Sequence, residues 1–367
     1  MTQPDIIVIG GGIAGISAAA ELAAHARVTV IEAEAQLGYH ATGRSAAIFI
    51  RNYGNATLRA LNAAAAPVFA APEGISDRSL LSPRGELLLA REDELAAFDA
   101  YCDGATGIDL LDGAEAADLV PILRPERIAR AALERDAQDI DVDRMLQGYA
   151  RMLRARGGQI ISGAPVSDIE HAHAAWRITA GGTTLTAPLL VNAAGAWADT
   201  VARLAGVAPM AITPMRRSAA LLPAPTGHDI TGWPLFGSIC ETWYAKPDAG
   251  KLMVSPADED PVEPHDAWPD DMVLAEGLDR YQQAVTLPVT RVEHSWAGLR
   301  SFAPDRTPVV GAAPDADGFF WLAGQGGYGV QTAPALARLT AALVTGGEPG
   351  LSDATVVALA PARFHSS

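Results

Sequence analysis

Three glycines near the start of the chain have the spacing of a dinucleotide-binding loop. Gly10, Gly12 and Gly15 make a G-x-G-x-x-G sequence between an apolar run at residues 5–9 and an alanine-rich run. In this order of strand, loop and helix, the first glycine permits a tight turn, the second lets the backbone approach a pyrophosphate, and the third lets helix and strand pack closely. A second apolar run ends at Glu32, whose carboxylate can accept hydrogen bonds from ribose hydroxyls. The start of the chain therefore predicts a bound dinucleotide.

The composition favours a globular protein of one large or two interwoven domains. The chain has 367 residues, 49% of them hydrophobic, and a formal net charge of −16, which argues against nucleic-acid partners. No apolar run reaches the roughly 18 residues of a membrane span, and no secretory signal is recognisable. Two cysteines, Cys102 and Cys240, fit a reducing cytoplasm. His171 and His173 lack further ligands at a fitting spacing, so no metal site is expected.

Strands and helices alternate at both ends of the chain, whereas the middle is rich in strand-like runs. We therefore expect an α/β fold in which a Rossmann-like domain of residues 1–85, 140–210 and 300–367 is interrupted by a β-rich (α+β) substrate domain of residues 86–139 and 211–299. Residues 256–271 are acidic and rich in proline, which predicts an exposed connection with a solvated acidic run at 258–260. The expected helices include residues 58–66, 92–101, 141–156, 272–285 and 333–344, and the expected strands residues 87–90, 159–162, 165–169, 176–179, 183–185, 189–192 and 319–323.

Several further motifs follow the glycine loop in a fixed order, at residues 38–46, 192–197, 297–300 and 326–332. Together they resemble the FAD-dependent D-amino-acid oxidase superfamily, which includes glycine and sarcosine oxidases. Over nearly the whole chain the sequence resembles the bacterial D-arginine dehydrogenases of that group. The resemblance implies the fold of that superfamily and non-covalently bound FAD. It implies FAD contacts from Gly10, Gly12, Ile13, Ala14, Gly15, Glu32, Ala33, Thr42, Gly43, Arg44, Ser45, Ala46, Val166, Ala194, Gly195, Trp197, Arg300, Gly326, Gly327, Tyr328, Gly329, Gln331 and Thr332.

The resemblance also implies a site that grips an amino-acid carboxylate. Arg217 and Arg300 match the arginines that bind it, and a planar guanidinium suits a carboxylate better than lysine does. Neighbours on a strand face opposite sides, so Arg216 is the alternative to Arg217. Tyr53 and Tyr244 match tyrosines that close over the substrate. Gly327 matches a glycine whose carbonyl meets the substrate amine, and none of these groups is an evident strong base.

The side-chain pocket departs from the D-arginine dehydrogenase pattern. Glu86 matches the acid that receives a guanidinium, but Ile48 and Ile50 stand where the relatives carry His and Thr. Leu235 and Gly237 replace Met and Val. A more apolar pocket discriminates by size and loses partners for a cationic group. We therefore expect tolerance for apolar D-amino acids, with cationic ones retained if Glu86 points inward.

The expected function is FAD-dependent oxidation of D-amino acids to imino acids, which hydrolyse to 2-oxo acids and ammonia. A hydride would pass from Cα to flavin N5, and a quinone-like carrier or oxygen would reoxidise the flavin. Alternatives on the same fold are a glycine, sarcosine or proline-type amine oxidase and a 2-hydroxy acid oxidoreductase. A flavin-holding protein without turnover is a further alternative. An NAD-dependent dehydrogenase is disfavoured, because the later motifs would have no task.

Overall fold

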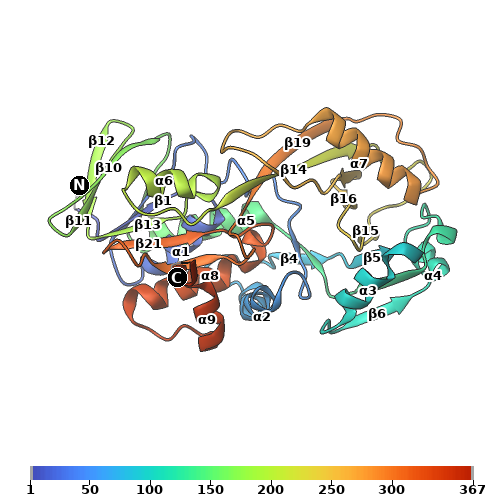
Figure 1. The fold of residues 1–367 in the computed structure, drawn as a ribbon, viewed down its shortest axis with the longest axis horizontal. Helices are drawn as coiled ribbons and strands as arrows, with labels where there is room; N and C mark the ends of the chain where they lie inside the picture. Colours follow the sequence, from blue (N-terminus) through green and yellow to red (C-terminus); the bar gives the residue numbers. More distant parts are fainter. Residues whose placement is uncertain (1–2, 365–367) are drawn as a thin grey trace.

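A computed structural model describes residues 3–364 of the chain. The molecule has two lobes, and both chain ends lie on the lobe at the left of Figure 1. That lobe is built on a six-stranded sheet, and the other lobe on a nine-stranded sheet.

The six-stranded sheet has the order β20-β21-β13-β1-β2-β9. All neighbouring strands in it are parallel except β20 and β21. Its strands read as continuous apolar runs because both faces are covered. The strands are β1 (Ile6–Ile9), β2 (Val28–Ile31), β9 (Gln159–Ile161), β13 (Leu189–Asn192), β20 (Val309–Ala312) and β21 (Phe319–Ala323).

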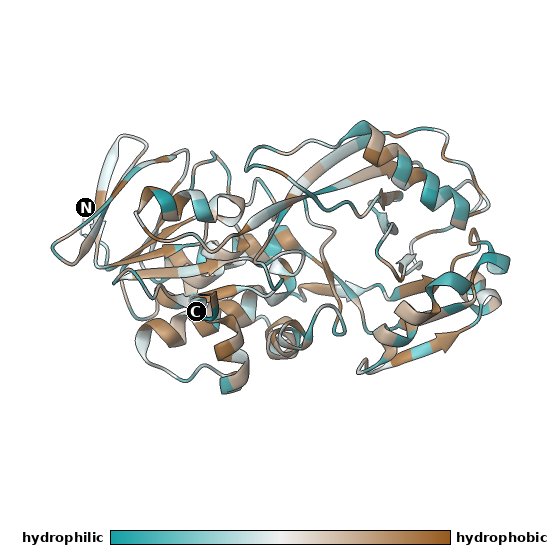
Figure 2. Ribbon diagram, in the orientation of Figure 1, coloured by the Kyte–Doolittle hydropathy of each residue, from teal (hydrophilic) through white to brown (hydrophobic). Residues whose placement is uncertain are grey.

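Helices cover one face of this sheet and a small sheet covers the other. Alternate residues of each strand separate into two cores: Val8 and Val30 pack with the helices, whereas Ile7 and Ile31 pack beneath the small sheet. Figure 2 shows the hydrophobic colour along the central strands. The helical side holds α1 (Ile13–Leu22), α2 (Ala56–Ala70), α5 (Val142–Ala155), α8 (Gly329–Thr345) and α9 (Asp353–Leu359); the other side holds β10 (Val166–Ala172), β11 (Ala175–Ala180), β12 (Thr183–Ala187) and α6 (Ala198–Leu204).

The nine-stranded sheet is mixed and forms the second lobe. Its path is β18-β14-β17-β16-β15-β5-β7-β6, with β19 paired to β14. A third core packs between this sheet and the helices beside it. The strands are β5 (Glu86–Ala90), β6 (Ile108–Leu111), β7 (Arg130–Glu134), β14 (Thr213–Leu222), β15 (Leu235–Ser238), β16 (Tyr244–Asp248), β17 (Lys251–Ser255), β18 (Asp260–Pro261) and β19 (His294–Phe302), and the helices α3 (Leu95–Cys102), α4 (Gly113–Leu119) and α7 (Asp271–Ala284).

A short three-stranded sheet lies where the chain passes between the lobes. It pairs β3 (Ile48–Phe49) and β4 (Leu81–Pro83) with β8 (Gln138–Ile140). Single 3-10 turns complete the chain: η1 (Glu92–Glu94), η2 (Pro125–Arg127), η3 (Gly195–Trp197) and η4 (Pro361–Phe364). Within residues 3–364 no helix is both long and apolar enough to cross a bilayer.

Most elements expected from periodicity are present, with ends that differ by a few residues. The last long helix begins at Gly329 instead of residue 333, because the glycine loop itself turns into the helix. The expectation of an exposed connection at residues 256–271 is wrong in part. Ala257, Asp258 and Ala267 are buried, and the segment contains β18. The two-domain division by residue ranges remains a proposal.

Candidate active site

One cavity of about 780 Å³ lies between the two sheets. It starts at the carboxyl end of β1, where ligands bind in open parallel sheets, and continues to one face of the nine-stranded sheet. Gly15, Gly43, Tyr328 and Thr332 lie outside its lining. The other residues predicted from the sequence line it: Gly10, Gly12, Ile13, Ala14, Glu32, Ala33, Thr42, Arg44, Ser45, Ala46, Ile48, Ile50, Tyr53, Glu86, Val166, Ala194, Gly195, Trp197, Arg217, Leu235, Gly237, Tyr244, Arg300, Gly326, Gly327, Gly329 and Gln331.

The glycine loop has the close contacts that its sequence predicts. Gly10 has φ +115°, and a Cβ there would lie 2.3 Å from the carbonyl oxygen of Ala193. A Cβ on Gly15 would lie 2.0 Å from the oxygen of Gly10, so this glycine serves helix–strand packing. The Glu32 carboxylate accepts from the amides of Gly11 (2.5 Å) and Glu34 (2.8 Å), which holds it beside the loop.

Three residues that line the cavity carry buried polar atoms without a hydrogen-bond partner. Arg300 Nη1, Ser301 Oγ and Gln325 Nε2 are buried without a hydrogen bond, and all three residues line the cavity. Buried polar groups are normally paired, so these atoms point to a polar ligand. Helix α1 also begins at the cavity. Its N-cap residue Gly12 makes no side-chain cap, and Thr42 Oγ1 accepts from the amide of Ile13 at 3.0 Å. The start of a helix attracts phosphate. The residues therefore fit a bound dinucleotide.

Some predicted cofactor contacts have their side chains engaged elsewhere. The Arg44 guanidinium donates to the carbonyls of residues 267 and 297 and pairs with Asp266. The Gln331 amide bonds to the backbone of Ile50 and to Asn62. Thr332 Oγ1 donates to the Tyr328 carbonyl within α8. We therefore expect these three residues to contact a cofactor through their backbone or their apolar atoms.

Strand register places the two predicted arginines on one face of the nine-stranded sheet. Arg217 of β14 is opposite Gly298 of β19, and Arg300 lies two residues beyond Gly298, so their side chains share a face. Both line the cavity. Arg216, the alternative, instead pairs with Asp258 and with the carboxylates of residues 260 and 270.

One carboxylate that the sequence did not reveal serves this pair. Glu259 lies 3.0 Å from Arg217 Nη2, 3.6 Å from Arg300 Nη1 and 3.0 Å from Arg306 Nη2. Burial alone would raise the pKa of Glu259, but the hydrogen bond from Arg306 and the charges of Arg217 and Arg300 lower it. Three guanidinium groups share one anion, so a net positive charge remains for a ligand carboxylate.

The expectation that residues 258–260 form a solvated acidic face is therefore wrong. Asp258 is 8% exposed and accepts from Ser218 N (2.6 Å) and Ser218 Oγ (2.7 Å). Its carbonyl also accepts from Arg217 Nε at 2.9 Å. The acidic residues 258–260 therefore form ion pairs and hydrogen bonds with Arg216 and Arg217 of β14.

Two tyrosines stand beside the arginines. Arg300 Nη2 donates to the Tyr53 hydroxyl at 3.3 Å, and the Tyr53 ring packs on Tyr328 with centroids 4.7 Å apart. Burial raises the pKa of Tyr53 to about 12, so its hydroxyl stays protonated. Tyr244 lines the cavity from β16. Gly327 lies against the guanidinium, because a Cβ there would be 2.6 Å from Arg300 Cζ.

Glu86 points into the cavity from β5 and has no hydrogen-bond or ion-pair partner among the described residues. It is 7% exposed, and burial raises its pKa well above the ordinary value, with further increases from Glu134 and Glu241. Ile48, Ile50, Leu235 and Gly237 line the cavity with it. The pocket therefore combines apolar walls with one unpaired acid.

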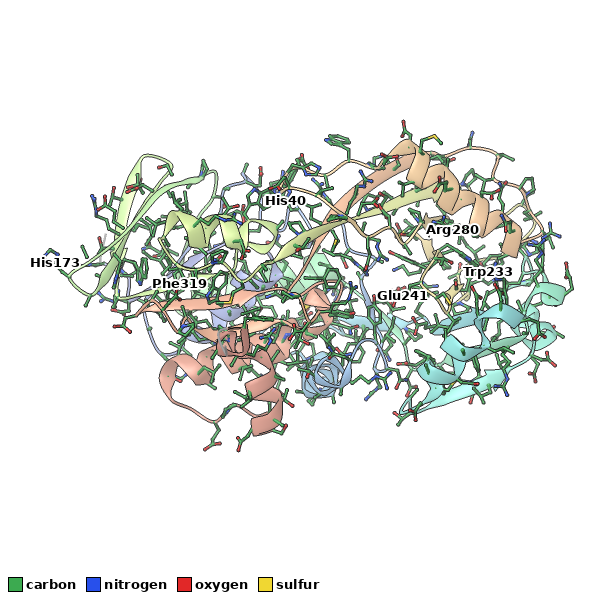
Figure 3. The ribbon with its side chains drawn as sticks, in the orientation of Figure 1. His40, His173, Trp233, Glu241, Arg280 and Phe319 are labelled. Carbon is green, nitrogen blue, oxygen red and sulfur yellow. The ribbon has the colours of Figure 1, made fainter. Side chains whose placement is uncertain are left out.

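Figure 3 shows where other ionisable side chains lie relative to this site. Glu241, in the turn between β15 and β16, lines the cavity and is exposed, whereas His173 lies at the tip of the β10–β11 hairpin. His171 belongs to β10, instead of the expected surface loop, and stacks on Trp176. In residues 3–364 no group of three His, Cys, Asp or Glu side chains could hold a metal, and both cysteines are free.

The fold and the cavity define a protein that holds a dinucleotide at the carboxyl ends of parallel strands beside a second sheet. The model of the FAD dependent oxidoreductase family (DAO) matches residues 5–343, and the chain belongs to this family. Its cofactor is therefore FAD.

Known proteins of this kind match along the whole chain. The glycine oxidase of Bacillus licheniformis is 24% identical over 368 residues, which cover 93% of this chain and 93% of that protein. The structure of L-proline dehydrogenase from P. horikoshii has a TM-score of 0.83 at 22% identity, and covers 99% of this chain and 98% of its own. Glycine oxidase from Geobacillus kaustophilus has a TM-score of 0.82 at 22% identity, with 96% and 97% covered. These likenesses confirm the predicted fold; a particular closeness to D-arginine dehydrogenases stays a prediction.

Proposed function

We propose that this protein oxidises the Cα–N bond of D-amino acids, giving imino acids that hydrolyse to 2-oxo acids and ammonia. The carrying observation is the convergence of Arg217, Arg300, Tyr53 and Glu86 on one cavity. Bound FAD supplies the two-electron acceptor for the hydride that leaves Cα.

The side chains of this chain bind and orient the substrate. The guanidinium groups of Arg217 and Arg300 receive the carboxylate, and Arg300 Nη1 has no other hydrogen bond. Tyr53 offers a hydroxyl held by Arg300, and its aromatic ring helps to exclude water. The Gly327 carbonyl is proposed to meet the amine. Fixing the carboxylate and amine at two points orients Cα, which is the largest part of what this site supplies.

The substrate side chain is proposed to lie against Ile48, Ile50, Leu235 and Gly237 and to end near Glu86. A buried unpaired carboxyl favours a cationic partner, because a charge-assisted bond would replace the solvation it has lost. We therefore propose a range that includes apolar D-amino acids and D-arginine or D-lysine. The D configuration rests on the resemblance of the motifs.

Anaerobic mixing tests this proposal. The protein as purified with its FAD should lose its flavin absorbance with D-leucine and D-arginine, and retain it with the L-enantiomers. Retained absorbance with every D-amino acid would overturn the proposal. Repeating the reaction in air distinguishes oxygen from a quinone-like carrier as the reoxidant.

A second candidate is an amine oxidase for glycine, sarcosine or proline, favoured by the matches to glycine oxidases and to L-proline dehydrogenase. Such small substrates would leave Glu86 without a partner. Higher kcat/KM with sarcosine or proline than with D-leucine and D-arginine would establish this alternative.

A further inference from the structure

The segment that carries Tyr53 has no helix or strand of its own. Residues 50–54 connect β3 to α2 in an irregular turn, and Gly54 has φ +87°. The position of such a backbone depends on the groups that accept from its N–H groups and donate to its carbonyls. The position of Tyr53 beside Arg300 is therefore set by the partners of this segment.

The FAD-binding lobe holds one side of the segment. Gln331 Oε1 accepts from the Ile50 amide at 3.1 Å, and Asn62 Nδ2 donates to the carbonyls of Ile50 (3.2 Å) and Tyr53 (3.1 Å). Gln331 and Asn62 also bond to each other at 2.8 Å. These contacts fix both ends of the turn and leave the amides of residues 51 and 52 free.

A single carboxylate from the other lobe holds those two amides. Glu134, at the end of β7, accepts from Arg51 N at 2.7 Å, Asn52 N at 3.4 Å and Asn52 Nδ2 at 2.6 Å. Asn52 extends the link by donating to the Thr106 carbonyl and accepting from its amide, each at 3.0 Å.

Glu134 is only 2% exposed, and among residues 3–364 no basic side chain forms an ion pair with it. Burial raises its pKa, and the bonds from Arg51 and Asn52 oppose that rise. The charge of Arg51 also lowers its pKa, but a buried carboxyl without an ion pair is still costly for packing alone. The hydrogen-bond donors to its carboxylate all belong to the two residues that precede Tyr53.

We propose that Glu134 is a positioning residue that fixes the 50–54 segment across the two lobes and so holds the Tyr53 hydroxyl at Arg300. Glu134 contacts neither Arg217 nor Arg300, and it acts through residues 51 and 52. It lies directly opposite Glu86 in the β5–β7 register, so the same strand pair shapes the side-chain pocket and places the tyrosine.

The first test measures the segment directly and needs no turnover. In E134Q an NH₂ group replaces one of the two acceptor oxygens, so at least one N–H group of residues 51 and 52 faces another donor and loses its hydrogen bond. Hydrogen exchange of a peptide covering residues 48–58 should then speed up about 10-fold, the usual cost of one unpaired buried donor. The matched control is D199N: Asp199 is 6% exposed and accepts from Met210 N and Ile212 N, away from this segment. Unchanged exchange in E134Q, or equal acceleration of the peptide in D199N, would overturn the proposal.

The second test rests on the proposed function and asks whether the segment acts through Tyr53. E134Q should lower kcat/KM for D-leucine about 10-fold in the wild-type background and about 2-fold or less in a Y53F background, since coupled residues are not additive. Equal factors in both backgrounds would show that Glu134 has only an architectural role, and would refute the link to the site.

The outcomes remain separable. Flavin that no amino acid reduces in the wild type would defeat the proposed function, and the exchange experiment would still decide the role of Glu134. If E134Q does not retain FAD, N52L removes three bonds of the same link and is tested in both backgrounds with the same expected factors.

Discussion

The E86Q variant is the sharpest test of the side-chain pocket. The carboxyl of Glu86 is buried, unpartnered and directed into the cavity. A charge-assisted hydrogen bond to a substrate guanidinium contributes about 1.5–3 kcal/mol, so its loss should lower kcat/KM for D-arginine roughly 10- to 150-fold. D-leucine makes no such bond, and its kcat/KM should stay within about 3-fold of wild type or rise, because a buried amide costs less than a buried acid.

The pH dependence gives an independent measurement of the same group. Burial raises the pKa of Glu86 well above its ordinary value, so its carboxyl stays protonated to higher pH than an exposed glutamate, and a bound cation favours the deprotonated form. Below that raised pKa the ratio of kcat/KM for D-arginine to D-leucine should therefore rise with pH, by up to about tenfold per unit. The ratio cancels titrations that affect both substrates equally. Steady-state assays across the pH range in wild type and E86Q measure it. Equal losses for both substrates in E86Q, or a wild-type ratio that does not vary with pH, would refute the reasoning.

Three further predictions concern the clamp, the cofactor loop and stability. R300K should lower kcat/KM for every amino acid about 10- to 150-fold, because the guanidinium hydrogen bond to the substrate carboxylate is lost. The control R363K replaces a half-buried arginine that pairs with Asp305, and it should change kcat/KM less than about 2-fold in the same assay. G15A should weaken FAD binding at least about 10-fold, because a Cβ at position 15 would lie 2.0 Å from the Gly10 oxygen. The flavin-to-protein absorbance ratio after gel filtration measures this loss. The control G232A, with open space around the new Cβ, should bind FAD normally. The pKa of Glu86 is raised in the folded state, so its contribution to stability is complete below the ordinary glutamate pKa and is lost as the pH rises toward the raised value. Over that pH window the free energy of unfolding of the wild type should fall relative to that of E86Q. Denaturant titration at several pH values measures this difference.

The parts of the site that the sequence predicted depend on local patterns. The glycine spacing placed Gly10, Gly12 and Glu32 around one cavity, since strand, loop and helix follow each other directly. Strand alternation allowed only one of Arg216 and Arg217 to face inward, and pairing with β19 decides for Arg217. Local rules could not choose between the two, because the acids that take Arg216 come from more than 40 residues away.

The roles of two carboxylates, Glu134 and Glu259, could not be predicted from the sequence for the same reason. Glu134 is 83 residues from Arg51, and Glu259 is 42 residues from Arg217. Their roles arise only when strands from different parts of the chain become neighbours. An acidic run is most often a solvated face, which is why the sequence of residues 258–260 predicts an exposed segment. Burial, which makes these acids informative, is a property of the tertiary fold.

The contact between Gly327 and Arg300 limits how this site can diverge. A methyl group at 327 would occupy the space of the guanidinium carbon, so an alanine-bearing descendant would have to carry its arginine in another rotamer. Any side chain at position 327 thus requires a change at Arg300, 27 residues earlier in the sequence, whereas Arg300 can be replaced without a change at 327.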